Sequence, residues 1–207
     1  MHIPDGLIPL EQSVIYLIIS LIILPISFYY CSRKTDMSKR LVLTGILTAV
    51  AVVATSVTIP SPMGIPMHFF IIPLVVLILG PFNAALVSFL ALLIQAFALG
   101  MGGVTTLGVN VLDMGIILSF VVYFVYRIFL NVNGKLAIFI STLSGILAAT
   151  VTQIVVLTIA NTTSLNVLLA SLLPYYLMIG VIEGIVNIII LEFISKTNNS
   201  ILELEKV

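Results

Sequence analysis

The sequence predicts an all-α integral membrane protein with about seven transmembrane helices. Hydrophobic residues make up 61% of its 207 residues and charged residues only 8%, whereas soluble domains carry about 25% charged residues. The mean hydropathy is +1.31, and the apolar residues gather in runs long enough to cross a bilayer. We therefore expect residues 1–207 to form a single polytopic membrane domain.

Each predicted helix is an apolar run that ends at charge, proline or glycine. The first follows a short amino-terminal segment, residues 1–12, and the second follows the basic pair Lys39-Arg40. The third is short for a span, and only Gly80-Pro81, a turn signal, separates it from the fourth. We interpret the third and fourth as a tight pair of helices.

Three longer runs complete the set. The fifth follows Gly102-Gly103, the sixth follows Lys135, and the seventh follows the polar stretch Asn161–Asn166. In chain order, the seven predicted helices are Ser13–Tyr30, Leu41–Thr58, Met67–Leu79, Pro81–Leu99, Val104–Phe129, Leu136–Ala160 and Leu168–Ile194.

The basic residues predict the orientation of the bundle. With seven spans, all eight fall on one side of the membrane, whereas six spans would divide them between both sides. The positive-inside rule makes the basic side cytoplasmic. We therefore expect the carboxyl terminus in the cytoplasm and the amino terminus outside, with the loops Ile59–His68, Gly100–Thr106 and Asn161–Asn166. The basic residues are Arg33, Lys34, Lys39, Arg40, Arg127, Lys135, Lys196 and Lys206.

The composition and the motifs exclude several classes of protein. The net charge is zero, which gives no basic surface for nucleic acid. Cys31 is the only cysteine, so neither an internal disulfide nor a cysteine-cluster metal site can form. The sequence has no Walker A motif, no His-Glu-x-x-His and no Gly-x-Ser-x-Gly. We therefore expect a protein that is not an enzyme and cannot hydrolyse ATP by that route, with membrane lipid around it.

Both histidines, His2 and His68, fall on the predicted outer side. No Lys or Arg precedes Glu11, so the start does not look like a secretory signal, and we expect Met1 to be retained with a free amine. The amine, the His2 main-chain nitrogen and the His2 Nδ1 then close fused five- and six-membered chelate rings, and His68 could supply a fourth nitrogen. This tetragonal set suits Ni²⁺ or Cu²⁺ and accepts Co²⁺, whereas Zn²⁺ favours a tetrahedral site.

Two other interpretations of these residues stay open. Isolated histidines are usually not ligands, so His2 can equally be part of a mobile tail and His68 an interfacial polar residue. Met63, Met67 and Met101 lie on the same predicted side. With His68 they could form a Cu⁺ site, because thioethers favour that ion, although methionines at helix ends more often serve packing.

Polar residues inside the predicted helices need partners. Asp113 and Glu183 lie near the middle of their helices, where a carboxylate costs about 2.5–3.5 kcal/mol. Asn110 shares a helix face with Asp113 and lies nearer the predicted outer side. These three residues either support the metal site from beneath or join neighbouring helices, as the central amides Gln95 and Gln153 would.

Gly45 and Ala49 form a small-xxx-small face on the second predicted helix. Such a face lets another helix approach closely. It serves either packing within this chain or docking of another membrane protein.

Several blocks of the sequence resemble the CbiM/NikM family. They are the opening Met1-His2-Ile3-Pro4-Asp5-Gly6, Leu79-Gly80-Pro81, Gln95-Ala96, the run Gly102–Met114 and the block Ile179–Gly184. Members of that family are the substrate-binding (S) components of energy-coupling-factor (ECF) transporters for cobalt and nickel, in the cell membrane of prokaryotes. The resemblance implies metal ligands at Met1, His2 and His68. This chain has Tyr176 where the family often has His, and Asp113 where a neutral amide is common.

From the resemblance we expect the substrate-capture component of an ATP-driven importer for Co²⁺ or Ni²⁺, with Co²⁺ slightly favoured. The implied partners are an ECF coupling membrane protein, which the face of Gly45 and Ala49 would contact, two cytoplasmic ABC-type ATPases and a small accessory membrane subunit. The transported ion is the expected ligand, with no cofactor. The alternatives are a stand-alone carrier driven by protons through Asp113 and Glu183, a Cu⁺-binding membrane protein, and a membrane scaffold that transports nothing.

Overall fold

The computed structural model of the chain describes residues 2–33, 37–57, 59–60 and 66–197. Within these ranges the chain is a bundle of helices with one two-residue ladder, in which β1 (Ile59–Pro60) pairs antiparallel with β2 (Pro66–Met67). Two π-helical segments, η1 (Gln95–Leu99) and η2 (Val111–Ile117), continue α4 and join α5 to α6. The helices are α1 (Leu10–Ser32), α2 (Met37–Ser56), α3 (Ile72–Leu79), α4 (Pro81–Ile94), α5 (Leu107–Asn110), α6 (Leu118–Phe129), α7 (Gly134–Ile159) and α8 (Leu165–Thr197).

Among the residues that the structure describes, six helical stretches are long and apolar enough to cross a membrane. They are Leu10–Ser32, Met37–Ser56, Pro81–Leu99, Leu107–Phe129, Gly134–Ile159 and Leu165–Thr197. The predicted all-α, multi-pass membrane protein is therefore confirmed. The side of the membrane on which each terminus lies stays a prediction.

The third predicted helix is observed as an extended segment followed by a short helix. After α2 the chain returns through residues 66–71, which are not helical, to α3. α3 ends beside the start of α2, where the guanidinium of Arg40 donates to the carbonyl of Leu79 (3.3 Å). The predicted helix over residues 67–79 is thus wrong for 67–71. Pro73 lies in the first turn of α3, where a proline is tolerated, whereas it would have broken the interior of a helix that began at Met67.

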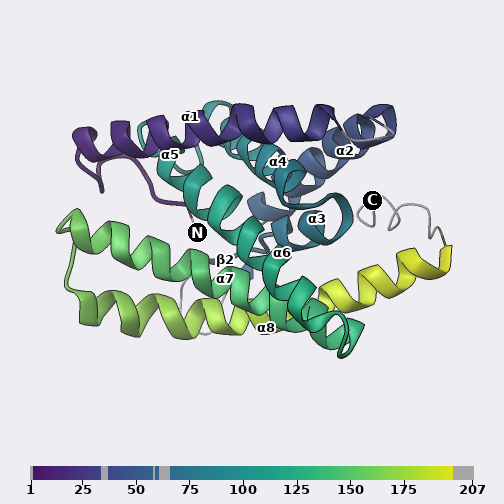
Figure 1. Ribbon diagram of the computed structural model, residues 1–207. Coiled ribbons are helices and arrows are strands. Elements are labelled where there is room, and N and C mark those ends of the chain that lie inside the picture. The colour runs from purple at the N-terminus through teal and green to yellow at the C-terminus, as the bar shows by residue number, and fades with distance from the viewer. Residues whose placement is uncertain (1, 34–36, 58, 61–65, 198–207) are drawn as a thin grey trace.

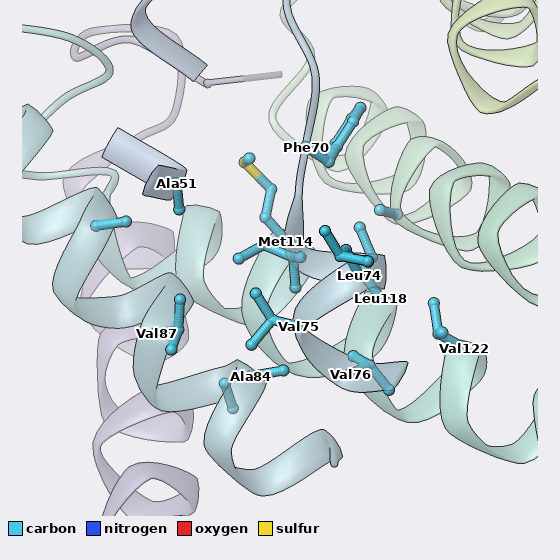
Figure 2. Close-up of a cluster of buried hydrophobic side chains, with 14 of the residues drawn as sticks. Ala51, Phe70, Leu74, Val75, Val76, Ala84, Val87, Met114, Leu118 and Val122 are labelled. Atoms are coloured by element: carbon cyan, nitrogen blue, oxygen red, sulfur yellow. The ribbon is translucent and has the colours of Figure 1, made fainter. Parts of the chain in front are cut away.

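α3 forms the centre of the bundle. All eight of its residues are buried, and it packs against α2, α4, α6 and α7. Figure 2 shows Leu74, Val75 and Val76 of α3 among apolar side chains of the neighbouring helices, such as Val87 and Leu118. A helix this short is not stable by itself, so α3 depends on this packing and on what holds its ends.

The loops gather at two opposite ends of the bundle (Figure 1). We call one end the histidine end; it carries the amino-terminal segment 2–9 and residues 100–106 and 160–164. We call the other the basic end; it carries the α1–α2 and α6–α7 connections and the last turns of α8. Lys135 and Glu192 form an ion pair there. Of the eight predicted basic residues, Lys34 and Lys206 lie outside the described residues.

The fifth predicted helix begins later than expected. Residues 104–106 are not helical, and the observed span starts at Leu107. Within it, the π-helical segment η2 directly follows Asn110. Because one turn of π-helix re-aims the side chains on either side of it, such segments occur often at functional sites. The other predicted spans differ from the observed helices by about one helical turn or less at their ends.

Candidate metal centre

The amino-terminal segment folds back from α1 into the middle of the bundle (Figure 1). Ile3 and Ile8 are buried, with 1% and 5% of their surface exposed. They pack in a small apolar cluster with α5, α7 and α8, whose members include Val109, Ile154 and Leu168. Burial of an isoleucine side chain stabilises by about 1.5–3 kcal/mol relative to exposure to water. The two isoleucines therefore anchor the segment that carries His2.

Asn110 fixes the main chain next to His2. Its Oδ1 accepts from the Ile3 N–H (2.9 Å), and its Nδ2 donates to the Ile3 carbonyl (3.1 Å). The hydroxyl of Thr106 donates to the same carbonyl (2.6 Å). The side-chain amide thus pairs with the main chain of Ile3 as a neighbouring β-strand would, and it holds the residue that follows His2 in one position.

Asp5 makes a second anchor, which the sequence does not reveal. Its Oδ1 accepts from the Thr105 N–H (2.9 Å), and its Oδ2 accepts from the Val104 N–H (3.1 Å). The Thr105 hydroxyl and the Thr106 N–H also donate to Oδ1. The hydrogen bond from the Thr105 side chain is the largest cause of a lowered pKa for Asp5. These partners lie about a hundred positions away in the chain, so no local pattern links them to Asp5.

Two glycines let the amino-terminal segment come this close. Gly102 has φ +77°, and a Cβ there would stand 3.3 Å from the Cβ of His2 and 3.5 Å from the Nδ2 of Asn110. A Cβ at Gly103 would collide with the carboxylate of Asp5. A side chain at Gly103 would displace the segment, whereas one at Gly102 would be strained by the positive φ and would crowd His2.

His2 and His68 lie side by side within this frame. Their ring centroids are 5.3 Å apart and the ring planes differ by 15°. Both ring nitrogens of His2 are buried and have no hydrogen-bond partner among the described residues. Buried polar atoms are nearly always paired in proteins, so the two unpaired nitrogens of His2 are candidate ligands for an ion.

Burial also sets the charge of the two rings. It lowers the pKa of His2 to about 2 and the pKa of His68 to about 3, from the ordinary value of 6.5. Both imidazoles are therefore neutral at physiological pH, the form that offers a lone pair to a metal. Met1, the third predicted ligand residue, lies outside the described residues.

Glu183 of α8 holds the chain that follows His68. Its Oε2 accepts from the Phe70 N–H (2.8 Å), and its Oε1 accepts from the Ile71 N–H (2.9 Å). Glu183 is fully buried. It had been expected either beneath the metal site or in a hydrogen bond between helices. The structure pairs it with the main chain that leads from His68 into α3, and its role at the metal site stays a prediction.

The other predicted polar residues differ in their hydrogen-bond partners. Asp113 is fully buried, and both its carboxylate oxygens lack a hydrogen-bond partner among the described residues. Gln95 donates to the hydroxyl of Thr55 on α2 (2.5 Å), so it joins two helices. The Oε1 of Gln153 has no partner in the described part of the chain.

The remaining candidates fall on the surface or outside the described part of the chain. Gly45 and Ala49 are exposed on α2, and a Cβ at Gly45 would meet no atom within 4 Å. They therefore do not serve packing among the described residues. Met101 is half-buried, Met63 lies outside the described residues, and of Met67 only the main chain is described.

Comparison with known proteins adds to this geometry. Residues 2–201 match the model of the CbiM family, described as a cobalt uptake substrate-specific transmembrane region. The chain is 33% identical over 204 residues to a cobalt transport protein CbiM of Clostridium tetani, covering 95% of this chain and 85% of that one. It is 31% identical over 205 residues to a putative fused nickel transport protein NikMN of Archaeoglobus fulgidus, covering 98% of this chain and 68% of the relative.

The fold is also similar to solved structures. One crystal structure, described as a transition metal transporter, superposes with a TM-score of 0.87 at 27% sequence identity, and the match covers 96% of this chain and 94% of that one. A truncated transition metal transporter superposes with a TM-score of 0.86 at 27% identity. Together with the family match over residues 2–201, these findings show that the chain belongs to the CbiM family of cobalt and nickel transport proteins.

Proposed function

We propose that this chain is the substrate-capture (S) component of an ECF-type, ATP-driven importer, and that it takes up Co²⁺ or Ni²⁺ with Co²⁺ slightly favoured. Membership of the CbiM family supports transport of these ions. The observation that carries the proposal is the pair of stacked, partly buried imidazoles of His2 and His68, with both nitrogens of His2 unpaired among the described residues.

The proposed ligand set consists of nitrogens. The Met1 amine, the main-chain nitrogen of His2 and its Nδ1 wrap one side of the ion, and the His68 imidazole completes a planar set of four. Such a set suits Ni²⁺ and accepts Co²⁺. Because the amine and the amide must lose protons, capture weakens in acid. The ion is the proposed cargo of the protein. Asn110 and Asp5 hold the segment that carries His2, through Ile3 and the Thr105 main chain. Glu183 holds the main chain that follows His68.

Uphill transport needs energy from other proteins. We propose an ECF coupling membrane protein, two cytoplasmic ABC-type ATPases and a small accessory membrane subunit as partners. The exposure of Gly45 and Ala49 on α2 supports docking of a partner helix over packing within the chain.

Calorimetric titration of the purified protein with Co²⁺ and with Ni²⁺ tests capture. We expect one ion per chain, weaker binding in His68→Ala, and much weaker binding when the three residues Gly-Ser-Gly are added before Met1, because the free amine is then too far from His2 to close the chelate rings. The same three residues added after Val207 are the matched control and should leave binding unchanged. Unchanged affinity of the amino-terminal extension would rule out the chelate.

Uptake by cells tests the rest of the proposal. Cells that produce the chain together with an ECF coupling protein and its ATPases should accumulate cobalt in an ATP-dependent way, and cells that produce the chain alone should not. Accumulation by the chain alone, abolished by Asp113→Asn, would instead indicate the proton-driven carrier, for which the buried, unpaired Asp113 is the supporting observation.

A further inference from the structure

We infer that Glu183 positions His68 as a metal ligand, and that it acts through the main chain of Phe70 and Ile71 without touching the ion. This inference rests on the proposed function, since it assigns the residue that presents one of the proposed ligands. It follows from the geometry of two consecutive N–H groups and the two oxygens of one buried carboxylate.

The chemistry of the contact requires a carboxylate. The N–H groups of Phe70 and Ile71 point to two different oxygens of Glu183, at 2.8 and 2.9 Å. An ionised carboxylate offers only acceptors, whereas an amide replaces one acceptor with a donor. Glutamine at this position can therefore satisfy one N–H group and must face the other with its own NH₂.

The held residues lie next to His68. Residues 68–70 form no helix or strand, so no regular hydrogen-bond ladder of their own fixes the histidine. Phe70 is fully buried, and its ring meets the ring of Tyr176 edge-on at 5.8 Å. Tyr176 and Glu183 lie seven residues apart on α8, so one face of that helix holds both the side chain and the main chain of Phe70.

The backbone at Ile71 shows that this contact constrains the chain. Ile71 has φ +64°, in the left-handed region that β-branched residues rarely adopt. A residue is held in that conformation only where its surroundings fix it. The hydrogen bond from Ile71 to Glu183 is such a constraint, and it fixes the angle at which the chain from His68 enters α3.

The support of His68 is separate from the support of His2. Ile3 is held by Asn110 and Thr106, and Asp5 is held by residues 104–106. Glu183 contacts none of these groups through the hydrogen bonds described. A change at Glu183 is therefore expected to act on the ligand His68 and to leave the three nitrogens of the amino-terminal chelate in place.

A double-mutant cycle tests this separation. Metal affinity is measured by calorimetry for the unmodified chain, Glu183→Gln, His68→Ala and the double variant, each in detergent after a thermal unfolding check. Loss of an outer partner of a ligand typically lowers metal affinity roughly 10–100-fold, and we expect such a loss for Glu183→Gln. In the His68→Ala background the same substitution should change affinity by less than about threefold, because the ligand on which it acts is absent.

The visible absorption of bound Ni²⁺ gives a second readout that general destabilisation does not move. Glu183→Gln should shift the d–d band of the ion toward that of His68→Ala. The reason is that the His68 nitrogen, the fourth ligand of the proposed set, is then held weakly or not at all. The matched control is Asn187→Ala, which removes a buried amide one turn further along α8 whose Nδ2 bonds the Thr142 hydroxyl (3.1 Å). The control should leave the band in place.

Three results would overturn the inference. They are an equal loss of affinity from Glu183→Gln with and without His68, an unshifted band in Glu183→Gln, or the same shift in the Asn187 control. If Glu183→Gln does not fold, Glu183→Asp, which keeps both acceptors on a shorter side chain, enters the same cycle. Equal affinity of the unmodified chain and His68→Ala would instead reject the proposed ligand set itself, which keeps the two failures distinguishable.

Discussion

The side chain of Asn110 pairs with both the N–H and the carbonyl of Ile3, at 2.9 and 3.1 Å. An amide is the side chain that can both donate and accept at such a pair. Asn110 is 2% exposed, so the contact is shielded from competing water. Asn110 therefore helps to set the position of His2 relative to the rest of the bundle, together with the other anchors of the amino-terminal segment.

Substitution of this amide is expected to weaken metal capture. In Asn110→Asp the side chain keeps its shape, but an ionised carboxylate cannot donate to the Ile3 carbonyl and repels it. We expect the affinity for Co²⁺ or Ni²⁺ to fall roughly 10–100-fold in calorimetric titration. Asn83→Asp makes the same chemical change at the basic end, where Asn83 bonds Thr44, and should leave affinity unchanged. Similar losses in both variants would show an effect of charge in the bundle and not of the contact with Ile3.

Removal of the Asp5 charge should loosen the loop that it caps. Asp5→Asn keeps one acceptor and turns its own NH₂ to the other of the N–H groups of Val104 and Thr105, so hydrogen–deuterium exchange at one or both of these amides should accelerate. Glu11→Gln, which changes an exposed carboxylate at the start of α1, is the control. Because the pKa of Asp5 is lower in the folded chain, its contribution is present above its ordinary pKa of 3.8 and is lost as the pH falls below that value. Unchanged exchange at both amides would show that Asp5 does not hold the loop.

Acid is expected to destabilise the metal-free protein through its histidines. The pKa values of His2 and His68 are lower in the folded chain than the ordinary 6.5, so below pH 6.5 the unfolded chain binds more protons. Stability therefore falls with pH, by up to about 1.4 kcal/mol per pH unit for each ring. Thermal unfolding between pH 7.5 and pH 5 should show this decline, at roughly those values. The double variant His2→Ala, His68→Ala should be nearly flat over the same range; an equally steep decline would assign the effect to other groups.

Neutralising Asp113 should leave equilibrium capture largely intact. Its oxygens have no hydrogen-bond partner among the described residues, and an unpaired carboxylate in a membrane bundle is unfavourable. Asp113→Asn preserves the shape, so calorimetric affinity should stay within about threefold and the unfolding temperature should stay or rise. Complete loss of binding would show that the carboxylate contacts the ion directly.

The positions of the membrane helices could be predicted from the sequence more completely than the contacts between residues far apart in the chain. The apolar runs predicted the membrane helices, because a span must be apolar along its whole length. Pro73 could have corrected the start of α3, since a proline marks the first turn of a helix. The partners of Asp5 and Glu183 could not be predicted. Both carboxylates bind main-chain N–H groups about a hundred positions away, and the main chain carries no sequence signal.

At the candidate site, too, the ligand residues could be predicted from the sequence, whereas most of the contacts that hold them could not. A chelating amino terminus and the loop residue His68 could be named from the chemistry of their nitrogens only together with the family resemblance, and the structure places the rings of His2 and His68 side by side. Asn110 was expected nearest to the outer side and is the residue that fixes Ile3. The two glycines at 102 and 103 were part of a recognisable block, but their role is steric and becomes visible only when Asp5 and His2 lie against them.

The central helix α3 ends at two side chains of opposite charge. The carboxylate of Glu183 lies at the main chain entering its amino end, and the guanidinium of Arg40 lies at the Leu79 carbonyl of its carboxyl end, which matches the direction of the helix dipole. Eight residues at a rise of 1.5 Å make a rod about 12 Å long. Because close-packed side chains surround it, α3 has little room to shift by itself. Glu183 and Arg40 therefore fix both ends of the buried helix that follows His68.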